Sequence, residues 1–159
     1  MRIATIAISA LAGLLMASPA LALTVEARVS TEFQKKLTDD IGVRESKILT
    51  DMLTKKVTTI FEQKGVNADR VVVTIEDAKP NRPTMEQVSD KPGLDPIRSI
   101  SIGGARVTGI AYDAAGKEIG TIDYNWYETS LQNVVAATTW SDARSSFDRF
   151  ARRFADKLT

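Results

Sequence analysis

Catalysis by this 159-residue chain would have to rest on carboxylates, lysines, arginines, tyrosines or serines, because the sequence contains no histidine and no cysteine. The missing imidazoles and thiols exclude Ser-His-Asp and Cys-His mechanisms and the usual zinc sites. The sequence also lacks a calcium loop of the D-x-[DN]-x-[DN]-G type, a phosphate-binding glycine loop and a G-x-S-x-G turn. We therefore assign no catalytic, cofactor-binding or metal-binding residue, and we expect no enzyme.

The chemically richest stretch is DAKPNRPTMEQVSDKPGLDPIRSISIGG, residues 77–104, which holds four of the chain's five prolines. Connections longer than about 12–15 residues without secondary structure of their own are usually functional or disordered. Prolines reduce the conformational entropy of the free chain, so residues 79–96 are predicted to form a preformed interaction loop. Its candidate interaction residues are Asn81, Arg82, Asp90, Asp95 and Arg98.

Within this loop we expect Asp95 and Arg98 to act as anchors at its end. Arg82 is expected to reach outward, because a guanidinium fork suits carboxylate or phosphate partners. A second interpretation stays open. The segment could be a crossover that travels around a sheet edge and is stiff only to resist proteases.

A second group of candidates lies on the strand face that the predicted helices leave uncovered. Glu76 and Asp123 form a possible acid–base pair of the glycosidase type, which would need a cleft and one raised pKa. Solvated cross-strand pairs explain the same pattern of charges. By alternation, this face is predicted to show Glu26, Arg28, Thr74, Glu76, Arg106, Asp123, Asn125 and Tyr127.

Three aromatic side chains, Tyr124, Trp126 and Trp140, are able to stack on a sugar ring. Tyr124 and Trp126 share a strand face with Ile122, and Trp140 opens the apolar stripe of the last helix, so core packing is the better interpretation. The last helix also has a basic outer face. This face suits anionic lipid headgroups or an acidic partner, and equally a charge-mixed solvated surface.

The elements that must position these side chains follow from hydrophobic periodicity. Strands are predicted at 24–30, 70–78, 97–113 and 118–128, and helices at 30–40, 44–64 and 139–158. Gly65 is expected to end the long helix, and Thr139 with Asp142 resembles a capping box. The order β-α-β-β-β-α predicts an α+β fold. We expect a two-layer sandwich with about four strands in one sheet and two amphipathic helices on one face.

The N-terminal stretch MRIATIAISALAGLLMASPALA predicts export. Arg2 forms a short positive region, residues 3–16 are apolar, and Ala20-Leu21-Ala22 is a cleavage site, so 1–22 is expected to be a signal peptide and 23–159 one periplasmic domain. No cysteine follows to carry a lipid anchor, and no second apolar stretch could span a membrane. Without Arg2, 20 basic residues balance 20 acidic ones, which argues against nucleic-acid binding.

The signal-peptide pattern, the strand-helix-strand opening, the YDAAGKEIG hairpin and the closing amphipathic helix resemble small envelope proteins of proteobacteria. The layout is also similar to small α/β domains of periplasmic and outer-membrane accessory proteins, such as the N-terminal domain of the Tol-system translocation protein. KPNRPT and PGLDPIRSISIGGA look like signatures of such a family. The resemblance implies an envelope location and a small α/β fold, and it transfers no activity and no functional residue.

These features support two hypotheses of function. The first is a non-enzymatic periplasmic module that binds another envelope protein or associates with itself. The alternative is a small-ligand-binding protein or a carboxylate-based hydrolase, with its site between the 79–96 loop and the uncovered sheet face. A concave pocket near Glu76, Arg82, Asp95 and Arg98 would favour the alternative, and a flat surface there would favour the first.

Overall fold

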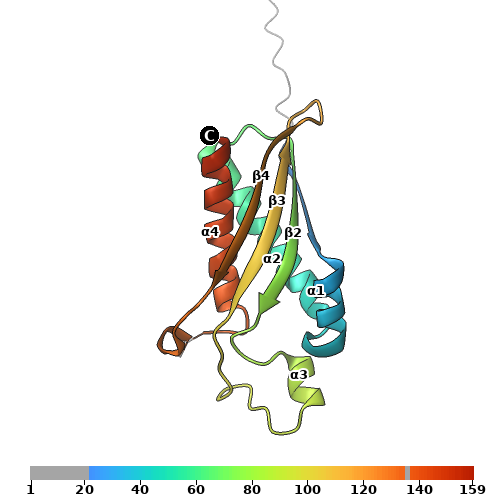
Figure 1. Ribbon diagram of the computed structural model, residues 1–159, viewed down its shortest axis with the longest axis vertical. Helices are drawn as coiled ribbons and strands as arrows, with labels where there is room; N and C mark the ends of the chain where they lie inside the picture. The colour runs from blue at the N-terminus through green and yellow to red at the C-terminus, as the bar shows by residue number, and fades with distance from the viewer. Residues whose placement is uncertain (1–21, 135–136) are drawn as a thin grey trace, which may run out of the picture.

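The computed structural model describes residues 22–134 and 137–159. Four strands form one mixed sheet, and two long helices pack against it (Figure 1). In chain order the elements are β1 (Thr24–Val29), α1 (Thr31–Lys36), η1 (Leu37–Ile41, a π-helical turn), α2 (Arg44–Lys64), β2 (Arg70–Lys79), α3 (Met85–Asp90), β3 (Gly104–Tyr112), β4 (Glu118–Tyr127), η2 (Leu131–Val134, a 3₁₀ turn) and α4 (Ser141–Leu158). The predicted α+β class is confirmed.

The strands lie in the order β1-β2-β3-β4. β1 is parallel to β2, with Val25 opposite Val71, whereas β2–β3 and β3–β4 are antiparallel. The register of β2 against β3 shifts between Ile75 and Asp77, so Glu76 is the extra residue of a bulge. The predicted strand 97–113 is shorter than expected, because pairing begins only at Gly104.

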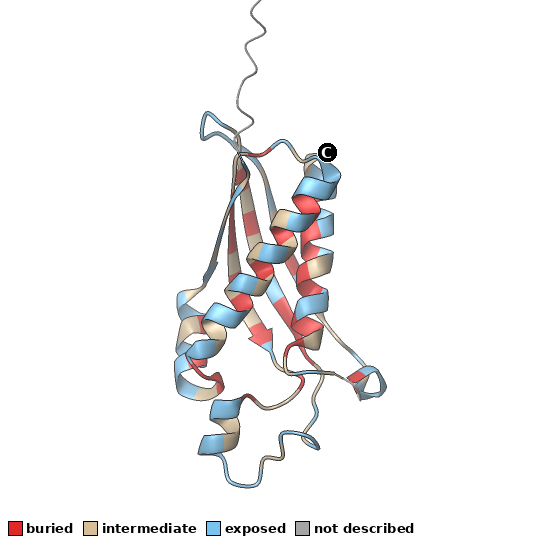
Figure 2. Cartoon of the chain, turned by 180° about the vertical axis from the view of Figure 1, so that it is seen from behind, coloured by how far each residue is buried: buried red, intermediate tan, exposed pale blue. Residues whose placement is uncertain are grey.

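Both long helices lie on the same face of the sheet (Figure 2), and their buried residues belong to one core cluster with those of the strands. The core combines alternate residues of β2 and β3 with the apolar stripes of α2 and α4, as periodicity predicts. Phe154 of α4 packs edge-on against Phe61 of α2, with ring centroids 5.5 Å apart. The helix α2 ends where expected, because Gly65 adopts a left-handed conformation with φ of 64°.

The start of α4 differs from the prediction. Trp140 occupies the N-cap position without a side-chain capping bond, so Thr139 and Asp142 form no capping box. Asp142 is instead 8% exposed and accepts hydrogen bonds from residues of another part of the chain.

Within the described residues, no helix combines the length and apolar character that a membrane span requires.

Candidate functional site

Residues 80–103, which we call the connection, join two strands that are immediate neighbours. Lys79 at the end of β2 lies opposite Gly104 at the start of β3. Two to five residues are enough to join such antiparallel strands, yet the connection has 24. The interpretation as a crossover around a sheet edge is therefore wrong. The topology does not require this length, so the connection is an insertion at one end of the sheet (Figure 1).

Both ends of the connection are fastened by a buried polar network around Asn81 and Asp142. The Asn81 amide donates to an Asp142 carboxylate oxygen at 2.5 Å and to the Ser101 carbonyl at 3.2 Å. The Asp142 backbone N–H donates back to the Asn81 side chain at 2.8 Å, and the Gly103 N–H donates to Asp142 at 2.9 Å. Buried polar groups paired in this way specify one arrangement of the chain.

Arg82 is not the outward-reaching residue that we expected. Its Nε donates to the Ala137 carbonyl at 2.5 Å, and its Nη1 donates to the Ile97 carbonyl. The guanidinium therefore ties the connection to itself and to the segment before α4. A side chain with several fixed donors suits this bridging role as well as it suits a partner's carboxylate.

The middle of the connection contains α3, a helix that the prediction of a structureless loop missed. Thr84 caps it by accepting from the Gln87 N–H, and Gln87 reaches back to the Thr84 N–H, which completes a capping box. Thr84 also donates to the Ile41 carbonyl of η1, and Lys91 pairs with Asp40. The hydrogen bond from Lys91 lowers the pKa of Asp40, so this carboxylate stays charged and holds α3 against η1.

The remaining predicted residues lie apart from this network. Asp95 accepts hydrogen bonds from the backbone N–H groups of Ile97 and Arg98, which lowers its pKa and shapes a local turn. The Arg98 side chain is 90% exposed and approaches Asp95 only to 4.0 Å, so it anchors little. Asp90 is exposed at the end of α3. The five predicted residues thus share one connection without converging on one site.

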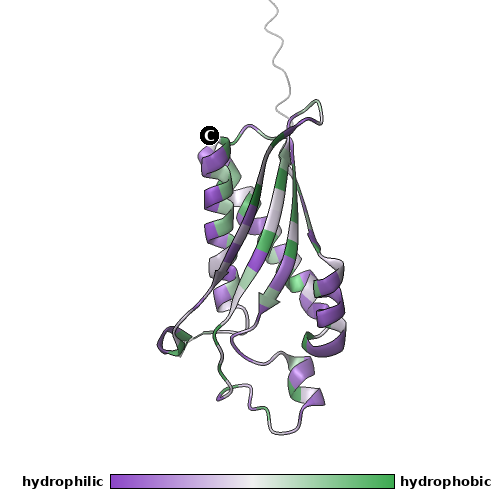
Figure 3. Ribbon diagram, in the orientation of Figure 1, coloured by the Kyte–Doolittle hydropathy of each residue, from purple (hydrophilic) through white to green (hydrophobic). Residues whose placement is uncertain are grey.

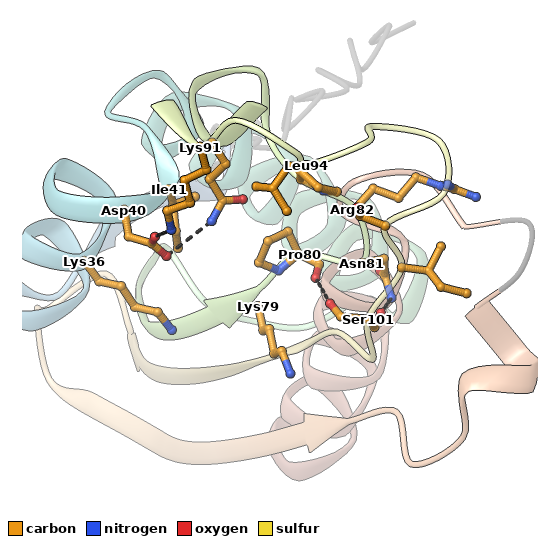
Figure 4. A pocket seen from close by; sticks show the side chains of 14 residues that line it. Lys36, Asp40, Ile41, Lys79, Pro80, Asn81, Arg82, Lys91, Leu94 and Ser101 are labelled. Carbon is orange, nitrogen blue, oxygen red and sulfur yellow. Dashed lines mark hydrogen bonds and ion pairs between the residues drawn. The ribbon is translucent and has the colours of Figure 1, made fainter. Parts of the chain in front are cut away.

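A cavity of about 480 Å³ opens between η1, the end of β2 and the connection. Figure 4 shows Pro80 and Leu94 near its centre, with the Lys91–Asp40 ion pair at one end and Arg82 at the other. Its lining contains four cationic side chains and one carboxylate. These residues, which define what we call the cationic cavity, are Lys36, Asp40, Ile41, Lys79, Pro80, Asn81, Arg82, Pro83, Gln87, Lys91, Leu94, Ser99, Ile100 and Ser101.

Large apolar side chains are exposed around this end of the molecule. Met85 on α3 is 80% exposed and Ile97 is 76% exposed, although both belong to a connection tied by hydrogen bonds. Leu131 on η2 is 53% exposed. η2 is linked to the connection, because the Ala137 N–H bonds to the Val134 carbonyl and the Ala137 carbonyl accepts from Arg82. Figure 3 shows hydrophobic residues on η2 and on the segment that leads into β3.

The open sheet face shows the predicted polar residues, paired across strands. Arg106 forms a two-bond ion pair with Asp123, at 2.7 and 3.2 Å, and Glu76 accepts a hydrogen bond from Thr108. The hydrogen bond from Arg106 lowers the pKa of Asp123, which is opposite to what a general acid needs. These contacts match solvated cross-strand pairs, the interpretation of this face that requires no catalysis.

The three aromatic side chains are engaged by the protein itself. Tyr124 and Trp140 are buried, and the Trp140 indole N–H donates to a Glu45 carboxylate oxygen at 2.6 Å. The guanidinium of Arg149 lies 4.4 Å from the Trp126 ring centroid, in cation–π geometry. This arrangement agrees with core packing and leaves little ring surface for a sugar.

Sequence reasoning missed the residues that organise the site, namely Asp142, Ser101, Lys36, Lys79 and Asp40. Asp142 is 61 residues from Asn81, and no local periodicity links them. One signal was present in the sequence, since Thr84 and Gln87 have the spacing of a capping box, T-x-x-Q.

No protein-family model matches the chain, and no curated protein matches it either. What the connection and its cavity can bind must therefore be judged from their own chemistry.

Proposed function

We propose that this chain is an exported, non-enzymatic periplasmic protein that binds another envelope protein through the connection and the surface around it. The observation that carries the proposal is an insertion of 24 residues between neighbouring strands. A connecting segment that is longer than the topology requires, and that is held in one conformation, is typical of a recognition element. Export is supported by the signal-peptide pattern of residues 1–22.

The exposed apolar side chains favour a protein partner. Met85 and Ile97 gain little hydrophobic free energy from the folded chain, because most of each side chain remains in water, and about half of Leu131 does too. Large apolar side chains that stand exposed at one end of a molecule are candidates for burial in a complex. Their burial on binding would supply hydrophobic free energy without a large ordering cost, since the backbone beneath them is already fixed.

A small anionic ligand is the second candidate, and the cationic cavity favours it. A volume of about 480 Å³ is within the range of ligand pockets. The alternative hypothesis placed a pocket near Glu76, Arg82, Asp95 and Arg98. Of these four residues only Arg82 lines the cavity, so the position of the pocket agrees with that hypothesis only in part. A small ligand leaves the exposed apolar side chains unexplained, which is why we place the protein partner first.

Site-specific photocrosslinking in intact cells tests the proposal. A photoreactive phenylalanine analogue at position 97 is expected to give discrete adducts with a second protein. The matched control is position 119, because Ile119 is also an exposed isoleucine, at 38%, but lies in the β3–β4 hairpin at the opposite end (Figure 1). Adducts of equal yield from both positions, or none from position 97, would contradict the proposal.

A further inference from the structure

We infer that the cationic cavity binds a side-chain carboxylate of an acidic, extended segment in the partner protein, with flanking apolar residues resting on Met85 and Ile97. This inference rests on the proposed function and names the chemistry of the partner. It makes the cavity, rather than the outer surface of the connection, the element that selects the partner.

The charge of the cavity favours an anionic occupant. Lys36, Lys79, Arg82 and Lys91 line it together with a single carboxylate, Asp40, so its lining has a formal charge of +3, or +2 when Asp77, the ion-pair partner of Lys36, is counted. The whole chain carries only +1. Positive charge is therefore concentrated locally on a nearly neutral protein, which attracts anions to this spot and repels cations.

Lys79 is the cation that is available to such a group. Lys36 pairs with Asp77 at 2.7 Å, Lys91 pairs with Asp40, and Arg82 donates to two main-chain carbonyls. Among the described residues, the exposed ammonium of Lys79 has no hydrogen bond or ion pair within the chain. A carboxylate that enters the cavity can thus pair with Lys79 without breaking an internal contact, and it gains from Lys36 nearby.

The rest of the cavity favours a polypeptide over a free small anion. Its centre is apolar, with Pro80 beside Leu94 (Figure 4). The two exposed apolar side chains stand outside the lining, on segments of the connection that are tied to its two ends. Met85 follows Thr84, which bonds to Ile41 at one end, and Ile97 bonds through its carbonyl to Arg82 at the other. An extended chain that crosses the cavity can place one carboxylate inside and an apolar residue on each side.

Selection from a phage-displayed library of random heptapeptides, with the full exported chain as bait, tests this inference. We expect selected peptides to be rich in Asp or Glu beside apolar residues. For one selected peptide, anisotropy titration should show a Kd at least about tenfold weaker when its acidic residue is replaced by the matching amide. Lys79→Met should weaken binding at least about fivefold, whereas Lys117→Met, in the β3–β4 hairpin, should not.

Three results would overturn the inference. The first is a selection without acidic enrichment, and the second is unchanged binding to Lys79→Met. The third is competition by free glutarate at the same concentration as the peptide, which would identify a small-anion site. The failure of this inference and of the proposed function remain distinguishable. Crosslinks from position 97 that persist in Lys79→Met would refute only the carboxylate pocket, whereas their absence in the otherwise unmodified chain would refute the protein partner.

Discussion

Asp142 and Asn81 hold the two ends of the connection to α4. The Asp142 carboxylate accepts from the Asn81 amide and from the Gly103 N–H, and all three groups are withdrawn from water. In water each would find a partner, so the network adds only modestly to the free energy of unfolding while it is complete. Its loss costs more, because donors would be left buried and unpaired.

Asp142→Ala should therefore lower the free energy of unfolding by roughly 2–5 kcal/mol, since two buried donors lose their acceptor. Urea melts measure the effect. Asp156→Ala is the matched control, because Asp156 lies on the same helix but is 59% exposed in an ion pair with Lys64. Its loss should cost less than about 1 kcal/mol. Equal shifts for the two variants would show that the network is unimportant.

At the scale of the element, Gly109 lets α4 approach β3. A Cβ atom at position 109 would lie 2.8 Å from Phe154 Cε1 and 2.9 Å from Phe150 Cζ, and both rings are fully buried. Rings packed in a core cannot withdraw without displacing their neighbours. This contact explains why the middle of a central strand holds a residue of low strand propensity.

Gly109→Ala is accordingly expected to destabilise the protein by about 1–3 kcal/mol through overpacking. Gly120→Ala on β4 is its control. The new Cβ there would meet only Leu158, with its Cδ2 as the close contact at 2.6 Å, at the end of a half-buried side chain in the last turn of α4. That methyl group can rotate away, so the cost should be smaller. Thermal melts that rank the two variants in the reverse order would contradict this packing argument.

Asp148 links the two long helices and should make their pairing sensitive to acid. Its carboxylate accepts a hydrogen bond from Arg152 on α4 and pairs with Lys56 on α2 at 3.0 Å. The hydrogen bond from Arg152, and then that from Lys56, lower the pKa of Asp148. A folded-state pKa below the unfolded one gives stability that is complete above about pH 5 and lost as the pH falls.

Asp148→Asn should thus be less stable than the wild type at pH 6, and the difference should shrink toward pH 3. Urea melts at both values measure it. Asp51→Asn serves as the control, because Asp51 pairs only with Lys47 of its own helix and joins no second element. If the difference in the free energy of unfolding between wild type and Asp148→Asn stays constant from pH 6 to pH 3, Asp148 does not have this role.

Most elements were predictable because their signals are local. The strands, the stripes of α2 and α4, and the left-handed stop at Gly65 follow from patterns within a few residues of one another. The helix α3 was missed because four prolines surround it and it has only six residues. The network of Asn81 with Asp142 joins residues 61 positions apart, and only the folded chain brings them together. Because its partner Asn81 is so distant in sequence, Asp142 was interpreted as a local capping residue of the last helix.

At the scale of the whole molecule, the two ends differ in character. The β3–β4 hairpin and the chain's C-terminus lie at one end, and the connection, η2 and the cationic cavity lie at the other (Figure 1). Export would expose this second end to other envelope proteins, as the proposed function requires. The location is therefore the first thing to establish.

Export with cleavage after Ala22 predicts a periplasmic product of 137 residues, Leu23–Thr159. Intact-mass measurement on protein recovered from the periplasmic fraction checks both the compartment and the cleavage position. Replacing the small residues of the cleavage site, as in Ala22→Arg, should cause the uncleaved form to accumulate at the inner membrane. A periplasmic or cytosolic product with the mass of the full chain would contradict the prediction.

The rigidity of the connection gives the last prediction. Trypsin cannot report on it before Arg98, because Lys79, Arg82 and Lys91 each precede a proline. Thermolysin can, since it cleaves before exposed apolar residues such as Met85 and Ile97. If the Asn81–Asp142 network holds the connection, Asp142→Ala should raise the rate of the first cut between residues 80 and 103 by at least about tenfold.

Gly109→Ala is the control for general instability, because it weakens the core and leaves the network in place. Rapid cleavage of the connection in the wild type, at the rate seen in Asp142→Ala, would mean that the segment is flexible, and its value as a rigid recognition surface would be lost.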